Sequence, residues 1–202
     1  MKLLRFPELT RRHLPHFFTL REEIAPQIQD LPKQLRQNGL PVALVAAEQV
    51  HGARVAKVSR AEAGRVIPGA DALICAESGV TLVVRVADCG PVWLHCKKTG
   101  AIGLVHSGRK GTALGIVPVT IRAMQKEFGA DPAEMLGLLG PCIRPPHYDV
   151  DFAGEILRQM KGEGVGEIVD SGLCTASDPE RFYSYRREKG KTGRHFAVLA
   201  AA

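Results

Sequence analysis

The sequence lacks any long hydrophobic run. No apolar stretch reaches the roughly 18 residues that a membrane-spanning helix needs. The first 18 residues, MKLLRFPELTRRHLPHFF, interrupt every short apolar stretch with arginine, glutamate or proline, which is unlike a signal peptide. We therefore predict a cytoplasmic protein that has no membrane partner.

The sequence also has no Cys-x-x-Cys pair, which excludes a structural zinc ribbon. Its five cysteines, at positions 75, 89, 96, 142 and 174, are odd in number. In a cytoplasmic chain such cysteines are expected to be thiols, metal ligands or nucleophiles rather than members of a disulfide framework.

Internal repeats, low-complexity segments and linkers are absent as well. A chain of 202 residues, 45% apolar and 24% charged, has the size and composition of one globular domain.

The net charge of +6 is mild, and the densest cluster of cationic residues lies at 181–194. Aromatics among these cations resemble a nucleic-acid-binding pattern, but a phosphate-bearing small substrate explains the cluster equally well. We predict no nucleic-acid partner.

Short apolar runs bounded by glycine and proline predict most of the strands. These runs lie at 16–20, 41–50, 70–76, 81–87, 92–96, 101–105, 134–139 and 196–202. Residues 54–58 are predicted to return after 41–50 as the second strand of a hairpin. Helical spacing of apolar residues predicts helices at 22–37, after Gly111, and at 152–160. In the second of these the buried stripe begins at Leu114 and ends at Phe128. Because helices interrupt runs of strands without regular alternation, we predict an α+β domain with a mixed sheet.

Three side chains that can bind a metal follow predicted strands: His51, Cys89 and His106. Two histidines and one cysteine suit zinc, and three protein ligands leave a fourth tetrahedral position open for water. Zinc lowers the pKa of bound water to about 7, which gives a nucleophile at neutral pH. The sequence therefore suggests a catalytic zinc site.

The same residues also allow chemistry without a metal, with Cys89 as nucleophile and His106 as base. Sequence alone leaves these two interpretations open, since both require the groups to be close together. Cys142, in the loop after a predicted strand, is expected to pack beneath that loop.

Several short motifs occur in the order seen in one known family. They are QVHG at 49–52, ADAL at 70–73, VADCGPV at 86–92, HSGRKG at 106–111, GPCI at 140–143, CT at 174–175, FYSYRRE at 182–188 and TGR at 192–194. In this combination the chain resembles the YfiH family, also called laccase-domain or polyphenol oxidase proteins. The resemblance implies an α+β fold with two mixed β-sheets sandwiched between helical layers (α/β/β/α). It also implies that residues 1–202 form a single domain with a shortened N-terminal segment.

The resemblance further implies a function and a set of site residues. Its metal triad falls on His51, Cys89 and His106, with zinc as the expected cofactor. Family members are described as cleaving adenosine, inosine and methylthioadenosine with phosphate, and as deaminating adenosine. The candidate catalytic residues are Asp88, Cys89 and Lys110. The candidates for holding phosphate or substrate are Arg109, Lys110, Arg186 and Arg187, because cationic side chains form charge-assisted hydrogen bonds to phosphate.

The sequence also departs from the family pattern. HSGRKG replaces HAGWRG, so Arg109 stands for a tryptophan and Lys110 for an arginine. Lysine keeps the charge but loses the planar fork of arginine. A Gly-Gly-x-Ser loop expected near the N-terminus is missing. Two alternatives therefore stay open: a metal-free Cys–His hydrolase acting on cell-wall precursors, and a degenerate member that binds purines without turnover.

The polyphenol oxidase name implies a copper cluster, and multicopper oxidases build theirs from His-x-His pairs. The sequence contains no such pair. A Cys/His site can nevertheless take up copper in vitro, because copper tops the affinity order of the divalent metals.

Overall fold

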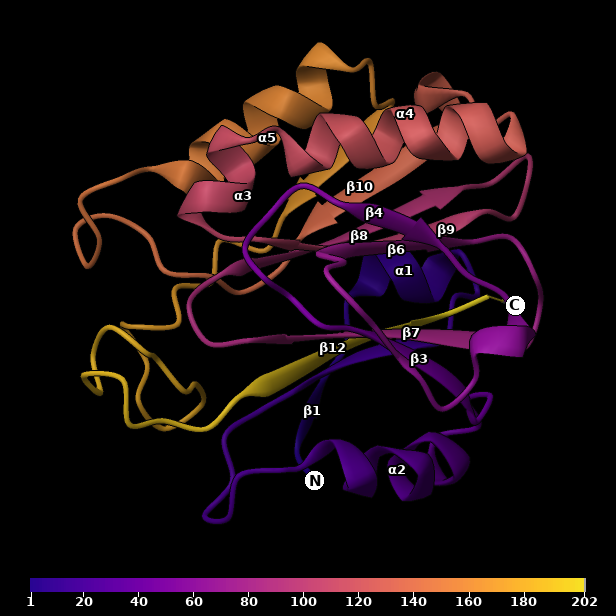
Figure 1. The fold of residues 1–202 in the computed structure, drawn as a ribbon. Coiled ribbons are helices and arrows are strands. Elements are labelled where there is room, and N and C mark those ends of the chain that lie inside the picture. The colour runs from indigo at the N-terminus through magenta and orange to yellow at the C-terminus, as the bar shows by residue number, and fades with distance from the viewer. Residues whose placement is uncertain (202) are drawn as a thin grey trace.

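Two six-stranded sheets form the centre of the protein in a computed structural model that describes residues 1–201 (Figure 1). The strands of the first sheet are, in spatial order, β1 (Leu3–Leu4), β2 (His16–Thr19), β12 (His195–Ala200), β7 (Val80–Val86), β3 (Ala43–Ala47) and β5 (Val66–Ile67). Those of the second are β11 (Glu167–Asp170), β10 (Met135–Leu139), β8 (Gly90–Cys96), β9 (Ile102–Ser107), β6 (Ala72–Cys75) and β4 (Val55–Lys57). Both sheets contain parallel and antiparallel pairs, as the mixed-sheet prediction requires.

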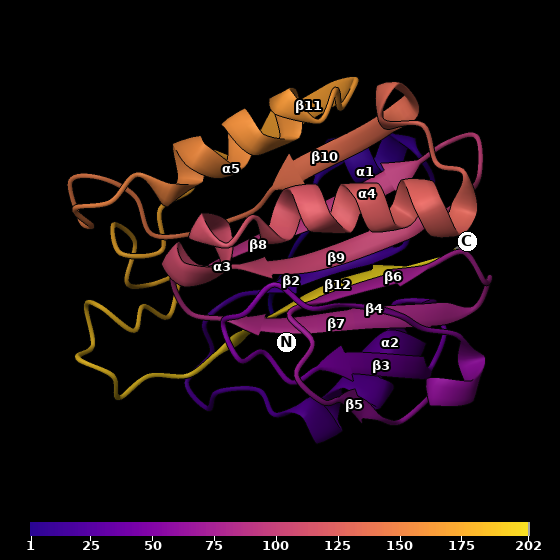
Figure 2. The ribbon, with the colours of Figure 1, turned by 45° about the horizontal axis from the view of Figure 1, so that its top comes forward.

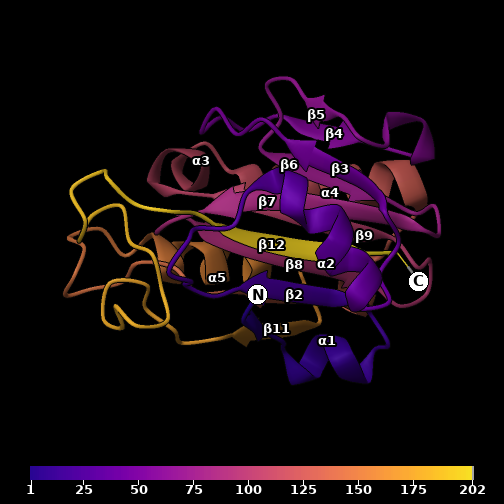
Figure 3. The same ribbon diagram turned by 90° about the horizontal axis from the view of Figure 1, so that it is seen from below.

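Helices cover the outer faces of the two sheets. In Figure 1, α3 (Arg109–Ala113), α4 (Ile116–Phe128) and α5 (Phe152–Gly162) lie above the second sheet, and α2 (Leu31–Gln37) lies below the first. The fifth helix, α1 (Pro7–Arg11), lies at one edge of the sandwich beside β11 (Figure 3). The predicted α/β/β/α layering is confirmed. None of the helices described here has the length and apolar character needed to span a membrane.

Three apolar clusters hold these layers together, and the largest lies between the sheets. Trp93 of β8 is fully buried there, and its indole N–H donates a 3.0 Å hydrogen bond to the carbonyl of Val198 in the opposite sheet. A buried indole usually finds such a partner because an unpaired donor is costly. Trp93 therefore connects the two sheets by packing and by a hydrogen bond.

Two of the predicted elements are wrong. The 22–37 helix is reduced to a 3₁₀ turn at Ile28–Asp30 followed by α2, and Ile24, expected on the buried face, is 85% exposed. Proline at 26 and 32 explains the loss, because proline cannot supply an amide to a helix interior. The 54–58 strand does not form a hairpin with 41–50. Instead β4 pairs in parallel with β6 of the other sheet.

The apolar stripe after Gly111 also needs one correction. Two helices occupy this region, since α3 ends at Ala113 with Leu114 as its C-cap, and the left-handed Gly115 (φ 74°) is the N-cap of α4. The interruption turns Leu114 away from the stripe and leaves it 61% exposed, whereas Val117, Ile121 and Met124 are buried. The helical periodicity therefore holds only from α4 onward.

This difference predicts unequal effects of truncation at the two positions. Ile121→Ala is expected to lower the free energy of unfolding by about 2–5 kcal/mol because it leaves a cavity beneath α4. Leu114→Ala should change it by less than about 0.5 kcal/mol, since that side chain already contacts water. Urea denaturation of the two variants measures the difference. Equal destabilisation would contradict the break at Gly115.

Candidate active site

The pairing of strands explains how Cys89 reaches the site. The chain crosses from the first sheet to the second at 87–89, between β7 and β8. Gly90 then lies opposite Ser107, so Cys89 faces the loop that follows β9. Figure 2 shows β7 and β9 pointing toward the same end of the sandwich. A Cβ atom at Gly108 would lie 2.5 Å from the Cys89 sulfur, so this close approach requires glycine.

His106 is placed by the neighbouring strand. Because Ala72 pairs with Val105, the start of β6 lies against the end of β9, and the His106 amide donates to the Asp71 carbonyl at 2.8 Å. His106 itself is 3% exposed. It lies on the same face of β9 as Leu104 and therefore points between the two sheets, at their end.

Asp71 orients both histidines. One carboxylate oxygen accepts hydrogen bonds from His106 Nδ1 (2.8 Å) and from the His51 amide (2.9 Å), and the other accepts from the Gly52 amide (2.8 Å). Since a carboxylate only accepts, the Nδ1 of His106 carries the proton in this contact, and Nε2 is the ring nitrogen left to interact with Cys89. Asp71 is fully buried, so its carboxylate is fixed in place.

The structure brings together the three side chains expected to bind a metal. One ligand atom of each of His51, Cys89 and His106 lies within 4.8 Å of the other two, and the imidazole rings meet edge to face with centroids 4.8 Å apart. Residues 1–201 contain no other group of three or more histidines, cysteines or acidic residues so arranged. His51 is exposed, so the cluster is open to the cavity on that side.

Charge interactions make Cys89 acidic and His106 basic. Burial alone would raise the pKa of the Cys89 thiol, but hydrogen bonds from His106 and His51 outweigh it and lower the pKa to about 7. Burial would likewise lower the pKa of His106, yet contacts with Asp71 and Cys89 raise it to about 9. A thiolate is therefore accessible at neutral pH, and thiolate is the form of cysteine that binds a metal.

This donor set fits a catalytic zinc ion. Zinc takes imidazole nitrogen and thiolate sulfur, and catalytic sites use three protein ligands with one open position. The carboxylate of Asp71 behind His106 is the outer-shell partner that metal-bound histidines usually have. The arrangement supports a metal site.

The backbone at this site is strained. Gln49, His51 and Asp88 have positive φ angles of 70°, 62° and 89°, which non-glycine residues seldom adopt. Such residues persist where the surroundings fix them, and they cluster at functional sites. No sequence pattern predicts these positive φ angles, because they depend on tertiary contacts such as the hydrogen bonds that Asp71 accepts from the amides of His51 and Gly52.

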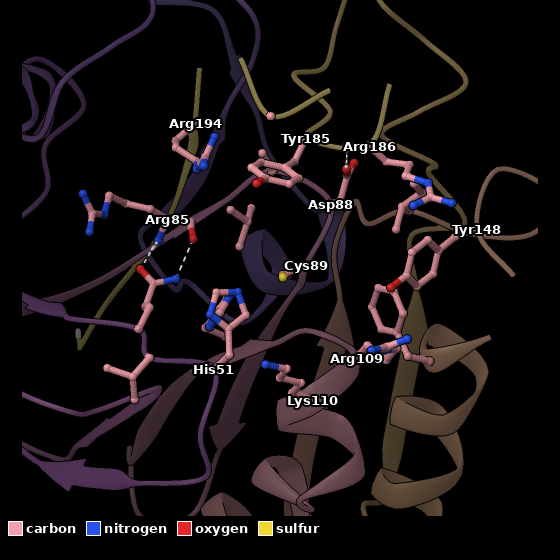
Figure 4. Close-up of a pocket in the computed structure, with 18 of the residues that line it drawn as sticks. His51, Arg85, Asp88, Cys89, Arg109, Lys110, Tyr148, Tyr185, Arg186 and Arg194 are labelled. Atoms are coloured by element: carbon pink, nitrogen blue, oxygen red, sulfur yellow. Dashed lines mark hydrogen bonds between the residues drawn. The ribbon is translucent and has the colours of Figure 1, made fainter. Parts of the chain in front are cut away.

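The cluster opens into a cavity of about 1130 Å³ (Figure 4). Three aromatic side chains line it: Tyr148, Phe152 and Tyr185. Six basic side chains also line it: Arg85, Arg109, Lys110, Arg186, Lys189 and Arg194. The only carboxylates in the lining are Glu48 and Asp88. The cavity is therefore positively charged, and the predicted site residues Asp88, Arg109, Lys110 and Arg186 all reach it.

Asp88, expected to be catalytic, holds a loop in place. Its two carboxylate oxygens accept from the Thr175 hydroxyl (2.6 Å) and from the Arg186 amide (2.7 Å). Both partners belong to 171–194, the long loop drawn in yellow in Figure 1. Asp88 thereby places the Arg186 side chain at the cavity wall, where its guanidinium lies 5.7 Å over the Tyr148 ring.

Arg187 is the one predicted substrate-binding residue that the structure does not bring to the cavity. Its guanidinium donates to the backbone carbonyls of Thr175, Ala176 and Phe182, and it pairs with Glu188 at 2.8 Å. Neighbours in the sequence point in different directions in this turn, so Arg186 faces the cavity and Arg187 faces the loop interior. Arg187 therefore stabilises the loop that presents Arg186. Cys142, as expected, is buried under its own loop.

Sequence reasoning missed several residues of the site. Asp71 was noted only as part of a strand, although a carboxylate directly before a buried apolar run is a usable sign. Arg85, the one charged residue of an otherwise buried strand, was another such sign. Tyr148 and Phe152 gave no signal, because only the fold brings them beside Tyr185 of the 171–194 loop.

The family model described as multi-copper polyphenol oxidoreductase laccase matches residues 22–155 and 147–202, most of the chain. The chain belongs to this family.

Proteins named purine nucleoside phosphorylase are similar to this chain over most of its length. A Deinococcus radiodurans protein named purine nucleoside phosphorylase is 32% identical over 98% of this chain and 92% of its own. Streptomyces coelicolor purine nucleoside phosphorylase SCO2081 is 34% identical over 76% and 73%. Among solved structures, Geobacillus stearothermophilus YlmD superposes with a TM-score of 0.88 at 24% identity, covering 100% of this chain and 96% of that one. This last likeness shows the fold alone.

Proposed function

We propose that the protein is a zinc-dependent purine nucleoside phosphorylase that also deaminates adenosine. The observation that carries the proposal is the placement of His51, Cys89 and His106 at the base of a cationic cavity with aromatic walls. Relatives at 32–34% identity bear the name purine nucleoside phosphorylase. Adenosine, inosine and methylthioadenosine are the proposed substrates, with inorganic phosphate as the second.

Phosphate would bind to the cations nearest the second sheet. Arg109 and Lys110 begin α3 directly after the His106 loop, and neither has a carboxylate partner within 4.0 Å in the described chain. Arg186 of the 171–194 loop also lines the cavity, and its ion pair in the described chain is with the exposed Asp149 at 4.0 Å. A phosphate oxygen accepts strong, charge-assisted hydrogen bonds from such groups. Lys110 acts as a point charge and would steady the negative charge of the attacking phosphate.

The purine base would lie against the aromatic walls. Tyr185 is 53% exposed, and Tyr148 packs edge to face with Phe152 at 5.9 Å. Exposed aromatic faces in a cavity stack well on a base. They would exclude water from one side of the nucleoside.

Zinc held by His51, Cys89 and His106 would supply a Lewis acid and a water of lowered pKa, which suits attack at the purine C6 in deamination. Asp71 would keep the His106 Nε2 directed at the metal by holding the proton on Nδ1. The proposal includes copper only as a metal that loads in vitro.

The test combines metal content with a phosphate-dependent assay. Protein purified without added metal is expected to contain about one zinc per chain and to release base from inosine only when phosphate is present. Arg109→Ala and Lys110→Ala should raise the KM for phosphate. Zinc without turnover would instead identify a degenerate purine-binding member, which nucleoside titration would reveal.

A second candidate is favoured by one observation. Cys89, His106 and Asp71 also form a chain of contacts like that of cysteine hydrolases, with the thiol pKa lowered to about 7. Such an enzyme, acting on cell-wall precursors, would lose activity to a thiol-alkylating reagent but not to a chelator. If a chelator removes zinc and activity in parallel, the metal-free hydrolase is eliminated.

A further inference from the structure

The 184–190 turn brings Tyr185 and Arg186 to the cavity, and Glu188 closes that turn (Figure 4). The Glu188 carboxylate accepts a hydrogen bond from the Ser184 amide at 3.1 Å, and the Glu188 amide donates to the Ser184 carbonyl at 3.0 Å. One residue therefore binds both backbone groups at the start of the turn. The two side chains that line the cavity lie between these contacts.

Glu188 also attaches the turn to the first sheet. The carboxylate oxygen that accepts from the turn lies 2.7 Å from a guanidinium nitrogen of Arg21 and 2.8 Å from one of Arg187. Arg21 follows the end of β2, and its amide donates to the Arg181 carbonyl at 2.8 Å. Its guanidinium lies 5.1 Å over the Tyr183 ring. Contacts of Arg21 thus join β2 to the start and to the middle of the loop.

The charge of Glu188 is what these contacts depend on. Burial would raise the pKa of its carboxyl group, but hydrogen bonds from Arg21, the Ser184 amide and Arg187 outweigh burial and lower the pKa to about 2. Among residues 1–201, no other carboxylate lies within 4.0 Å of the Arg21 or the Arg187 guanidinium. A neutral side chain at 188 would leave both cations without a counter-ion.

The backbone of the turn decides where Tyr185 and Arg186 point, because packing does little to fix their side chains. Tyr185 is 53% exposed, and the Arg186 side chain is 61% exposed. A ligand that meets groups already held in place loses less conformational freedom on binding. Glu188 is neither among the residues that line the cavity nor in the group of metal ligands. Its effect on a ligand must therefore pass through the turn.

We infer that Glu188 is a positioning residue for substrate, which together with Arg21 holds the 184–190 turn in the form that presents Tyr185 and Arg186 to the ligand. The inference rests on the proposed function for the identity of that ligand, a nucleoside with phosphate. Asp88 holds the Arg186 amide independently. Loss of Glu188 is therefore expected to loosen the turn and weaken binding, while the metal ligands stay in place.

Steady-state kinetics of Glu188→Gln test the inference. Glutamine keeps the shape of the side chain but removes its charge. The KM for inosine is expected to rise at least about 10-fold, because hydrogen bonds to a charged group are lost, while kcat stays within about threefold and zinc content is unchanged. Asp178→Asn is the matched control, since Asp178 lies in the same loop and pairs with Arg181 at 3.7 Å without touching the turn. It should leave KM unchanged.

A double variant tests the part assigned to Arg21. Arg21→Gln alone should also raise the KM for inosine. Because Arg21 and Glu188 act through one contact, Arg21→Gln combined with Glu188→Gln should raise KM little further than Glu188→Gln alone. Fully additive effects would show that Arg21 acts without Glu188 and would overturn its role.

Amide hydrogen exchange of the zinc-loaded protein without substrate, followed by NMR, observes the turn directly. The Arg186 amide is the reporter, since its acceptor Asp88 is intact in every variant. Glu188→Gln should speed its exchange at least about 10-fold, and Asp178→Asn should not. Faster exchange with an unchanged KM would reduce Glu188 to a structural residue and overturn the inference. A raised KM with unchanged exchange would also overturn it, because Glu188 would then act on the ligand without moving the turn.

Failure of the proposed function is distinguishable from failure of the inference. Calorimetric titration with inosine, without phosphate, compares wild type and Glu188→Gln in the absence of turnover. If wild type binds inosine without cleaving it and Glu188→Gln weakens binding, the positioning role stands and the phosphorylase proposal fails. If wild type cleaves inosine with a KM that Glu188→Gln leaves unchanged, the proposal stands and the positioning role fails. A wild-type protein that neither binds nor cleaves inosine would overturn both.

Discussion

Cys89→Ala is expected to abolish bound zinc and to lower nucleoside turnover by at least about 1,000-fold. The sulfur is one of only three ligand atoms that meet within 4.8 Å, so its loss leaves two imidazoles that cannot hold the ion firmly. A catalytic metal supplies several kcal/mol of transition-state stabilisation, and each 1.36 kcal/mol is a factor of ten in rate. Metal analysis and a phosphate-dependent inosine assay on the same preparation measure both effects.

The matched control for this variant is Cys174→Ala. Cys174 is also a free, half-buried thiol, but it does not line the cavity. It should keep one zinc per chain and nearly full turnover. If Cys89→Ala kept its zinc and its activity, the proposed metal site would be wrong. If it lost activity while the wild-type enzyme contained no zinc and resisted chelators, Cys89 would be a nucleophile instead.

Local patterns predicted most of the fold because strands of this type need only apolar runs and turn residues. The layer order followed from the resemblance and is confirmed by the two sheets and their helices. Errors arose where a local feature overrode the pattern. Gly115 splits one predicted helix and frees Leu114, and Pro26 and Pro32 shorten another.

The candidate site was only partly predictable for a different reason. Strand ends suggested His51, Cys89 and His106 separately, but their meeting depends on the pairing of β6, β8 and β9, which no spacing in the sequence encodes. The direction of a side chain in a turn is equally hidden. For that reason Arg186 and Arg187 looked alike in the sequence, although only Arg186 lines the cavity.

Asp71→Asn is expected to weaken zinc binding by about 10- to 100-fold although Asp71 is not itself in the group of metal ligands. Both carboxylate oxygens accept from N–H groups: His106 Nδ1 and the His51 amide on one oxygen, and the Gly52 amide on the other. Asparagine has one oxygen and one NH₂ group. In either orientation the NH₂ faces an N–H donor, so one of the two histidines loses its support or the loop shifts.

Asp88→Asn provides the matched comparison, because Asp88 is also buried and also accepts two hydrogen bonds. One of its donors is the Thr175 hydroxyl, which can turn to accept from the new NH₂ while the asparagine oxygen still accepts from the Arg186 amide. Asp88→Asn should therefore keep zinc affinity within about twofold of wild type. Competition with a chelating dye measures the zinc affinity of each variant. Urea denaturation of the zinc-free proteins shows whether either substitution also changes the free energy of unfolding. Equal zinc affinity in the two variants would show that Asp71 stabilises the fold without orienting the histidines, whereas selective loss in Asp71→Asn would establish it as the residue that positions His51 and His106.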